Sequence, residues 1–222
     1  MDDPELDAGR HLQALRGLAR LNRFSRADRI LWGPIRRLAS RVGSAPLRVL
    51  DIATGAGDLP VRLWRRAGRD RSALEIEGCD RSPQAVAYAR RRAERAGAPV
   101  RFFEWDLLER PVPSGYDLIL CSLFLHHLDE DRVVGLLRGM TDSARRMVLV
   151  SDLRRSPAGL ALAAAGARLL SRSDVVQADG PRSVRAAYTI PEVRELLRRA
   201  GRPEAQVLRR WPFRFLLIWE RG

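Results

Sequence analysis

Short apolar runs alternate with helix-type segments between residues 47 and 153. The runs have the length of β-strands and read LRVLDI, LEIEGC, VRFFEW, YDLILCS and RMVLVSD. Strands that alternate with helices of about ten to fifteen residues form right-handed βαβ units, and such strands lie parallel in one sheet. This alternation therefore predicts an α/β fold, with a mostly parallel sheet and helices on both of its faces.

The segments outside this alternation predict additions to the same domain. Residues 1–43 are predicted to form an N-terminal helical cap, in which residues 10–42 have helical periodicity. Gly33-Pro34 predicts a break into two helices that close over the site. Residues 154–190 form an insertion after the fifth strand, with an Ala/Leu-rich helix followed by an irregular basic stretch. The final AQVLRRWPFRFLLIWE predicts two strands joined at Trp211-Pro212, so one strand must run antiparallel. The whole chain, 1–222, is predicted to be a single domain.

The composition is that of a soluble cytoplasmic protein. Hydrophobic residues make up 45% and charged residues 30% of the chain. The acidic start MDDPELDAGR lacks the pattern of a signal peptide, and no apolar run reaches the roughly 18 residues of a membrane span. Cys79 and Cys121 lack the spacing of metal ligands, which favours buried thiols in a reducing compartment.

The net charge of +13 raises the question of nucleic-acid binding. The chain has no lysine, so all 40 of its basic residues are arginine. Such a complete absence points to codon bias, and the arginines are spread along the whole chain. The charge alone therefore does not indicate a nucleic-acid partner.

The glycine-containing turn DIATGAGDLP follows the first predicted strand, where open α/β sheets bind their ligands. A dinucleotide site needs G-x-G-x-x-G, but Pro60 stands at the third glycine position and Asp58 adds a negative charge. Asp80, 23 residues beyond Gly57, has close to the spacing of a residue that binds ribose hydroxyls. Asp106 follows the third strand, where a carboxylate can accept a hydrogen bond from an adenine amino group. These features together predict a site for a nucleoside that lacks a pyrophosphate.

The chain resembles the class I S-adenosylmethionine-dependent methyltransferases. VLDIATGAG resembles their D/E-x-G-x-G-x-G loop, with Ala53 at the first glycine position, and GCDRS resembles their ribose-binding acidic turn. WDLLERPVPSGYDLILCS resembles their adenine-side aspartate and fourth strand, and the closing hairpin their reversed final strand. The resemblance covers residues 45–153 and 188–221, and it implies a Rossmann-like sheet of seven strands.

This resemblance implies S-adenosylmethionine as the cofactor, S-adenosylhomocysteine as the product, and a role for each matched residue. The methionine part would contact the first loop, which holds Asp51, Ala53, Gly55 and Gly57. The ribose would contact Asp80 and Arg81, and the adenine would contact Asp106 and Leu107. Ser122 would lie beside the sulfur that bears the methyl group.

The residues after the fourth strand bear on the acceptor. Enzymes that methylate amino groups of bases have an Asp/Asn-Pro-Pro-aromatic stretch here, whereas this chain has Cys121-Ser-Leu-Phe124. Cys121 is expected within a buried strand, which disfavours a cysteine nucleophile of the cytosine-C5 type. LFLHHLDED resembles the small-molecule branch that includes quinone and polyketide methyltransferases. Methylation of ribose or tRNA stays open at this point.

His126 and His127 are the candidate catalytic residues, and the competing interpretation is that either ring only packs or bonds the backbone. An imidazole titrates near pH 6.5 and is suited to take the proton of a phenol. Adjacent residues in an extended chain point to opposite sides, so we expect one ring at most to face the acceptor. We favour His127 for that position, and the same geometry argues against a metal site.

The substrate side is predicted to include Asp152, Arg154, Arg185 and Tyr188. We expect methyl transfer to a small aromatic or lipophilic natural-product acceptor, first by O-methylation of a phenolic hydroxyl. C-methylation of a quinol or polyketide carbon is the alternative reaction. An RNA methyltransferase and a non-catalytic cofactor-binding module are the alternatives from other classes.

Overall fold

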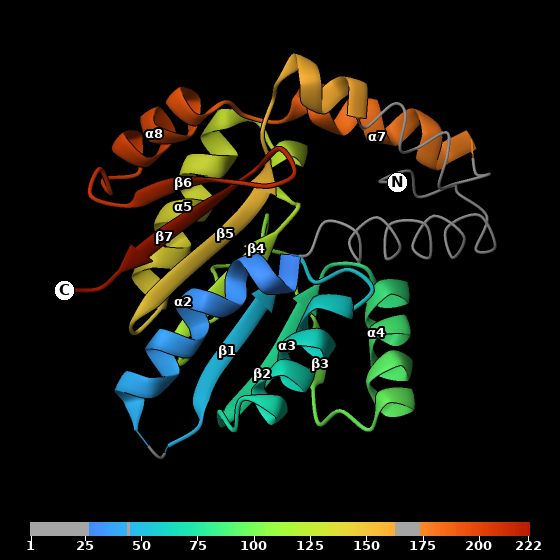
Figure 1. Ribbon diagram of the computed structural model, residues 1–222, viewed down its shortest axis with the longest axis vertical. Coiled ribbons are helices and arrows are strands. Elements are labelled where there is room, and N and C mark those ends of the chain that lie inside the picture. The colour runs from blue at the N-terminus through green and yellow to red at the C-terminus, as the bar shows by residue number, and fades with distance from the viewer. Residues whose placement is uncertain (1–26, 44, 163–173) are drawn as a thin grey trace.

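The computed structural model describes residues 27–43, 45–162 and 174–222. Its centre is a seven-stranded sheet with the order β3-β2-β1-β4-β5-β7-β6 (Figure 1). Only β7 runs antiparallel to its neighbours β5 and β6, which confirms the predicted sheet with one reversed strand. The strands are β1 (Leu47–Ile52), β2 (Leu74–Asp80), β3 (Arg101–Glu104), β4 (Leu118–Ser122), β5 (Met147–Leu153), β6 (Gln206–Arg210) and β7 (Arg214–Glu220).

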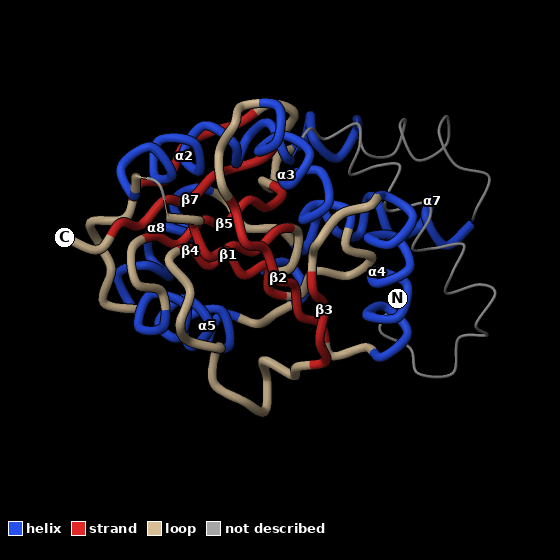
Figure 2. Tube along the Cα trace, turned by 90° about the horizontal axis from the view of Figure 1, so that it is seen from below, coloured by secondary structure: helices blue, strands red, loops and turns tan. Residues whose placement is uncertain are grey.

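Helices cover both faces of the sheet, as Figure 2 shows for α2 and α3 on one side and α5 on the other. One apolar core lies beneath α2, α3 and α4, and a second lies beneath α5 and α8. None of the described helices combines the length and apolarity needed to cross a bilayer. The helices are α2 (Ala27–Val42), α3 (Asp58–Arg69), α4 (Pro83–Ala96), α5 (Glu130–Ser143), α7 (Asp174–Ala186) and α8 (Ile190–Arg199).

Capping residues fix where the sheet-covering helices begin. The side chain of Ser82 accepts a hydrogen bond from the backbone N–H of Ala85, and Pro83 opens α4, as the sequence predicts. Asp129 caps α5 in the same way. Both caps lie at the carboxyl edge of the sheet, so they help to set the position of the loops that precede them.

The predicted break at Gly33-Pro34 is wrong, because α2 continues through both residues. A proline inside a helix removes one hydrogen bond and costs about 3 kcal/mol. Leu31, Trp32 and Ile35 are buried against the sheet, and each apolar side chain of this size contributes about 1.5–3 kcal/mol on burial. This burial outweighs the lost hydrogen bond. The rest of the predicted N-terminal cap, 1–26, lies outside the described residues.

The insertion after β5 also differs from the prediction. Most of the stretch that was predicted to be irregular and basic is the helix α7, with Pro181 inside it. Val184 and Ala187 are buried, and α7 contacts the loop that carries the histidines. Tertiary packing therefore overrides the local turn signal. Most of the predicted Ala/Leu-rich helix, residues 158–170, lies outside the described residues.

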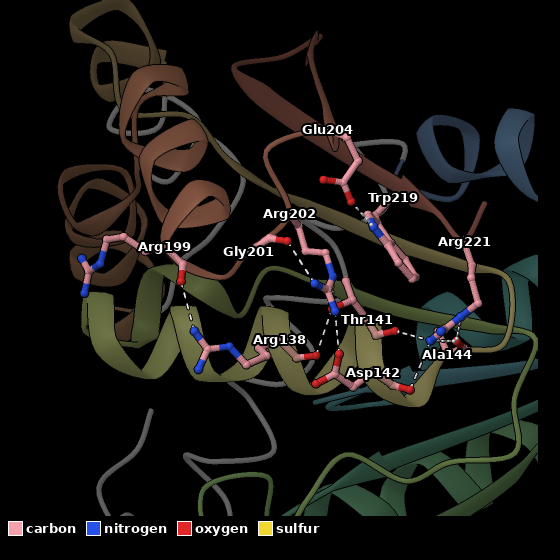
Figure 3. A network of polar contacts seen from close by, with 10 residues as sticks. All are labelled: Arg138, Thr141, Asp142, Ala144, Arg199, Gly201, Arg202, Glu204, Trp219 and Arg221. Carbon is pink, nitrogen blue, oxygen red and sulfur yellow. Dashed lines mark hydrogen bonds and ion pairs between the residues drawn. The ribbon is translucent and has the colours of Figure 1, made fainter.

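Arginines join the end of α5 to the last strand and to the segment after α8 (Figure 3). Nη2 of Arg221 donates to the carbonyl oxygens of Thr141 and Ala144, at distances of 2.7 and 3.0 Å. Nη2 of Arg202 lies 2.6 Å from Oδ1 of Asp142. The contacts of Arg221 satisfy carbonyl groups that a helix leaves without partners at its C-terminus, and Arg202 adds an ion pair. They fix the face of the molecule that α5 and α8 cover.

Candidate active site

The two glycines in the loop after β1 have different surroundings. Gly55 and Gly57 both have positive φ, of 55° and 67°. A Cβ on Gly55 would meet no atom within 4 Å, whereas one on Gly57 would lie 2.6 Å from Cβ of Ala89 and 2.8 Å from Cζ of Phe102. Gly57 therefore lets the start of α3 pack closely on α4 and β3. Gly55 leaves open space above the loop, where the backbone can approach a ligand.

Asp51 is a buried carboxylate under this loop. Its Oδ2 accepts a hydrogen bond of 2.6 Å from the hydroxyl of Thr54, and its Oδ1 has no partner among the described residues. Burial raises the pKa of Asp51 to about 8, Thr54 opposes the rise, and the charges of Asp58 and Asp80 add to it. A cationic ligand group near these carboxylates would relieve their repulsion.

Asp80 ends β2 beside the same loop. Its Oδ2 accepts a hydrogen bond of 2.8 Å from the N–H of Gly55, and its Oδ1 accepts one of 3.0 Å from the N–H of Ser82. Each carboxylate oxygen keeps a second acceptor site, and Asp80 is only half-buried, so it can also bind hydroxyl groups. Arg81, the next residue, is exposed.

Asp106 and Leu107 follow β3 on the same edge, and both are half-buried. Oδ1 of Asp106 accepts a hydrogen bond of 2.8 Å from the N–H of Leu108, which fixes the carboxylate in the turn. The structure thus places Asp51, Asp80 and Asp106 at the ends of three neighbouring parallel strands. The open space at Gly55, the unpartnered Asp51 oxygen and the half-buried carboxylates fit an amino-sulfonium group, a ribose and an adenine in a row.

The histidines follow β4 in a short helical turn. Ser122 ends β4, and a 3₁₀ turn, η1 (Leu125–His127), begins three residues later. The premise of an extended chain is therefore wrong: the two imidazole centroids lie only 4.2 Å apart, with a tilt of 37°. His126 is buried, whereas His127 is exposed. The turn brings both rings to one place instead of sending them to opposite sides.

Asp152, near the end of β5, holds the buried histidine. Its Oδ1 lies 2.7 Å from Nδ1 of His126, and its Oδ2 accepts the N–H groups of Phe124 and Leu125 at 3.0 and 2.7 Å. Burial alone would raise the pKa of Asp152. His126, the backbone N–H of Leu153 and the charge of Arg214 nevertheless hold this pKa below its ordinary value. Because the carboxylate accepts this hydrogen bond, Nδ1 of His126 is the donor, and Nε2 is the ring nitrogen left to exchange a proton.

Arg214, the first residue of β7, lies beside Ser122 at the end of β4 and was not among the predicted site residues. Its side chain is fully buried, and its Nη2 donates to the hydroxyl of Ser122 at 3.2 Å and to the carbonyl of Ser151 at 3.0 Å. The sequence did carry one signal for it, since an arginine inside the apolar run WPFRFLLIWE is unusual for a buried strand.

The predicted residues of the insertion divide into two sets. The hydroxyl of Tyr188 donates to the carbonyl of Leu128 at 2.7 Å, which ties the insertion to the histidine turn. Arg154 forms a β-bridge with Tyr188, and its Nε is buried without a hydrogen-bond partner among the residues that the structure describes. Arg185 is exposed in the last turn of α7. The first two therefore lie next to the histidine turn, while the structure shows no contact there for Arg185.

Comparisons with known proteins agree with this geometry. A family model described as a methyltransferase domain matches residues 49–146. The demethylmenaquinone methyltransferase of Thermus thermophilus is 40% identical over 108 residues, which cover 47% of this chain and 47% of that protein. The ubiquinone biosynthesis O-methyltransferase of Xanthomonas euvesicatoria is 27% identical over 138 residues, which cover 61% of this chain and 55% of that protein. The chain spans about half the length of these curated relatives.

Solved structures with the same fold include two methyltransferases. The magnesium protoporphyrin IX methyltransferase of Synechocystis PCC 6803, crystallised with bound SAM, has a TM-score of 0.59 at 16% identity and covers 99% of this chain and 100% of that one. An O-methyltransferase family 2 protein of Planctomyces limnophilus, crystallised with apigenin, has a TM-score of 0.64 at 17% identity and covers 100% of this chain and 64% of that one. The chain therefore has the fold of these solved methyltransferases, and its residues 49–146 match a methyltransferase domain.

Proposed function

We propose that this chain transfers the methyl group of S-adenosylmethionine to a small aromatic or lipophilic acceptor, first by O-methylation of a phenolic hydroxyl. The observation that carries the proposal is the bond of 2.7 Å between His126 and the buried Asp152, next to three carboxylates that fit the cofactor. Curated relatives named for demethylmenaquinone and ubiquinone support a ring-shaped acceptor.

The proposed cofactor contacts follow the ends of the strands. Asp80 and Arg81 hold the ribose, Asp106 and Leu107 hold the adenine, and Ser122 lies beside the sulfur. The methionine part lies over the first loop, against Asp51, Ala53, Gly55 and Gly57. Bound in this way, S-adenosylmethionine supplies an electrophilic methyl group, and the protein's task is to align the acceptor and remove its proton.

The proposed base is His126. Its Nε2 takes the phenolic proton while the S–CH3 bond breaks and the O–CH3 bond forms, which leaves S-adenosylhomocysteine as the second product. The carboxylate of Asp152 stabilises the resulting imidazolium at Nδ1. A phenol has a pKa of about 10 in water, so a positioned base contributes about 10²- to 10⁴-fold in rate. The sequence favoured His127 as the acceptor-facing ring, but the ring that Asp152 contacts is that of His126. We propose that His127, Arg154 and Tyr188 shape the acceptor pocket instead.

C-methylation of a quinol carbon is a second candidate, favoured by the relative of 40% identity named demethylmenaquinone methyltransferase. The same base serves this reaction, because removing the phenolic proton makes the neighbouring ring carbons nucleophilic. The position of the new methyl group in the product, determined by NMR, distinguishes the two reactions.

The first experiment measures cofactor binding by calorimetry with S-adenosylhomocysteine. We compare wild type with Asp80→Asn and with Glu104→Gln, a control that removes an exposed carboxylate at the end of the adjacent strand. We expect Asp80→Asn to weaken binding by about tenfold or more, since hydrogen bonds to a charged group contribute about 1.5–3 kcal/mol. Glu104→Gln should leave binding unchanged. A wild type that binds no S-adenosylhomocysteine would refute the proposal.

The second experiment follows labelled methyl transfer from S-adenosylmethionine to a panel of phenols and quinols, with total RNA as a separate arm. We expect transfer to at least one phenol or quinol and none to RNA. Transfer to RNA alone would establish the rival RNA methyltransferase. Cofactor binding without transfer to any acceptor would favour a non-catalytic module.

A further inference from the structure

Arg154 is a half-buried cation directly after β5, and the described residues give it no anionic partner. Its Nε is buried without a hydrogen-bond partner in the part of the chain that the structure describes. The next residue, Arg155, is paired with Glu192 instead. Burying a cationic group costs free energy unless it is paired and hydrogen-bonded. An unpartnered buried N–H therefore needs an explanation, and an anionic ligand is one.

The extended chain places Arg154 on the histidine side of the sheet. Side chains alternate between the two faces of a strand, so Arg154 shares a face with Asp152, which contacts His126. The chain stays extended through Arg154, because this residue forms a parallel β-bridge with Tyr188 and donates its backbone N–H to the carbonyl of Phe213. Two residues of a strand span about 7 Å, so Arg154 lies that far along the strand from Asp152. A ligand at His126 is therefore within reach of a long side chain at this position.

Asp152 does not supply the anion that Arg154 lacks. Its two oxygens accept hydrogen bonds from the ring of His126 and from three backbone N–H groups. A carboxylate has about four acceptor positions, and these bonds occupy them. The anion that completes Arg154 must then come from a ligand, and the acceptor is the ligand that the proposed function brings to this face.

The surroundings of the guanidinium fit an aromatic carboxylate. Cζ of Arg154 lies 5.9 Å from the centroid of the Phe213 ring, so an aromatic wall stands beside the charge. Nε–H and one Nη–H of a guanidinium form a fork that matches the two oxygens of a carboxylate. One guanidinium balances one negative charge, which suits a carboxylate better than a phosphate with nearly two.

We propose that Arg154 binds a carboxylate of the acceptor, so that the preferred substrates are hydroxylated aromatic acids rather than neutral phenols. This inference rests on the proposed function, in which the acceptor's hydroxyl lies against His126. The aromatic ring spans the distance between the two side chains. The phenolic proton still goes to His126, so Arg154 acts in binding and orienting the acceptor and not in proton transfer.

The test measures binding of hydroxybenzoates and hydroxynaphthoates, each beside its methyl ester, by calorimetry with the full chain in excess S-adenosylhomocysteine. The ester keeps the ring and the hydroxyl but has no charge. We expect the best acid to bind wild type about tenfold or more tightly than its ester, because hydrogen bonds between charged groups are strong. Acids that bind no better than their esters, or not at all, overturn the proposal. This comparison needs no variant, so it does not depend on whether a variant folds.

Variants then assign the preference to one side chain. Arg154→Met should weaken binding of the acid by about 10- to 100-fold and leave binding of the ester nearly unchanged. Arg154→Lys should keep part of the affinity, because it retains the charge but not the fork of parallel donors. Arg155→Met is the control, since it removes the same charge one residue away. Equal losses for acid and ester, or equal losses in the two methionine variants, would leave Arg154 with a structural role.

Steady-state kinetics separates this inference from the proposed function. With the best acid as acceptor, Arg154→Met should raise KM by about 10- to 100-fold and change kcat much less. Methyl transfer to neutral phenols without any preference for acids would uphold the proposed function and overturn the role of Arg154. Acids that bind through Arg154 but accept no methyl group would refute the proposed function and leave the carboxylate site standing.

Discussion

Burial of Asp51 links stability to pH at the scale of one residue. The pKa of its carboxyl is about 8 in the folded chain, against an ordinary value of 3.8. Between these values the folded chain holds a proton that the unfolded chain has released, so this group makes the free energy of unfolding fall as pH rises. For Asp51→Asn without cofactor, we expect the gain in melting temperature over wild type to widen from pH 5 to pH 8 and then level off.

Melting curves by circular dichroism at pH 5, 6.5, 8 and 9 measure this gain. Asp131→Asn is the control, because its carboxylate is 91% exposed and any effect should stay nearly constant over this range. A gain for Asp51→Asn that does not change between pH 5 and pH 8 would contradict the expected protonation of Asp51.

The two adjacent histidines differ in what holds them. Replacing the ring bound to Asp152 removes the proposed base, so His126→Ala should lower kcat by about 10²- to 10⁴-fold. His127→Ala, which leaves that ring in place, should stay within about tenfold of wild type. Steady-state kinetics with the best phenol of the panel gives both numbers, and calorimetry checks that both variants still bind S-adenosylhomocysteine. Equal turnover by the two variants would speak against His126 as the base.

Residues that follow a strand directly were predictable from the sequence, and residues paired across the sheet were not. Asp51, Asp80 and Asp106 could be placed together because parallel strands bring their carboxyl ends to one edge. The contact of His126 with Asp152 depends on the register of β5 against β4, and the contacts of Arg214 depend on that of β7 against β5. No local pattern encodes either register, so these contacts needed the structure.

At the scale of the element, the loop between β1 and α3 separates packing from ligand contact. Gly57→Ala puts a methyl group against Ala89 and Phe102 at positive φ, and we expect a loss of about 2–4 kcal/mol in the free energy of unfolding. Gly55→Ala has the same backbone strain but open space around the new methyl group, so its loss should be about 1–2 kcal/mol.

Urea unfolding and calorimetry together test this separation. We expect Gly55→Ala to lose more affinity for S-adenosylhomocysteine than stability, because its methyl group would enter the proposed ligand space. Gly57→Ala should show the reverse order. Equal stability losses in the two variants would mean that the packing of Gly57 on α4 is not what restricts this position.

Helices with clear end signals were predicted well, and helices held by tertiary contacts were not. α4 and α5 begin where Ser82 and Asp129 predict, because a capping side chain acts on its own neighbours. α2 and α7 each contain a proline that predicts a break, yet both continue. α2 is buried against the sheet and α7 against η1, so both depend on residues that are far away in the chain. A prediction from neighbouring residues alone cannot include such contacts.

At the scale of the whole molecule, the cofactor should act as a stabilising ligand. A ligand that binds only the folded chain at 100 times its Kd adds about 2.7 kcal/mol to the free energy of unfolding. For a chain of this size that corresponds to about 5–10 °C in melting temperature. We expect this shift with S-adenosylhomocysteine for wild type, and little shift for Asp80→Asn at the same concentration. A full shift for Asp80→Asn would remove Asp80 from the site.

The reversed strand β7 has a consequence for synthesis of the chain. It is the last of the seven strands in chain order, yet it lies between β5 and β6 inside the sheet. While the ribosome makes the protein, β6 has no neighbour to pair with until β7 emerges, and the hydroxyl of Ser122 lacks the guanidinium of Arg214. The residues of the first five strands, with His126 and Asp152, are all made before this hairpin. The centre of the sheet and the His126–Asp152 pair therefore precede the hairpin in synthesis, and the buried arginine is added last.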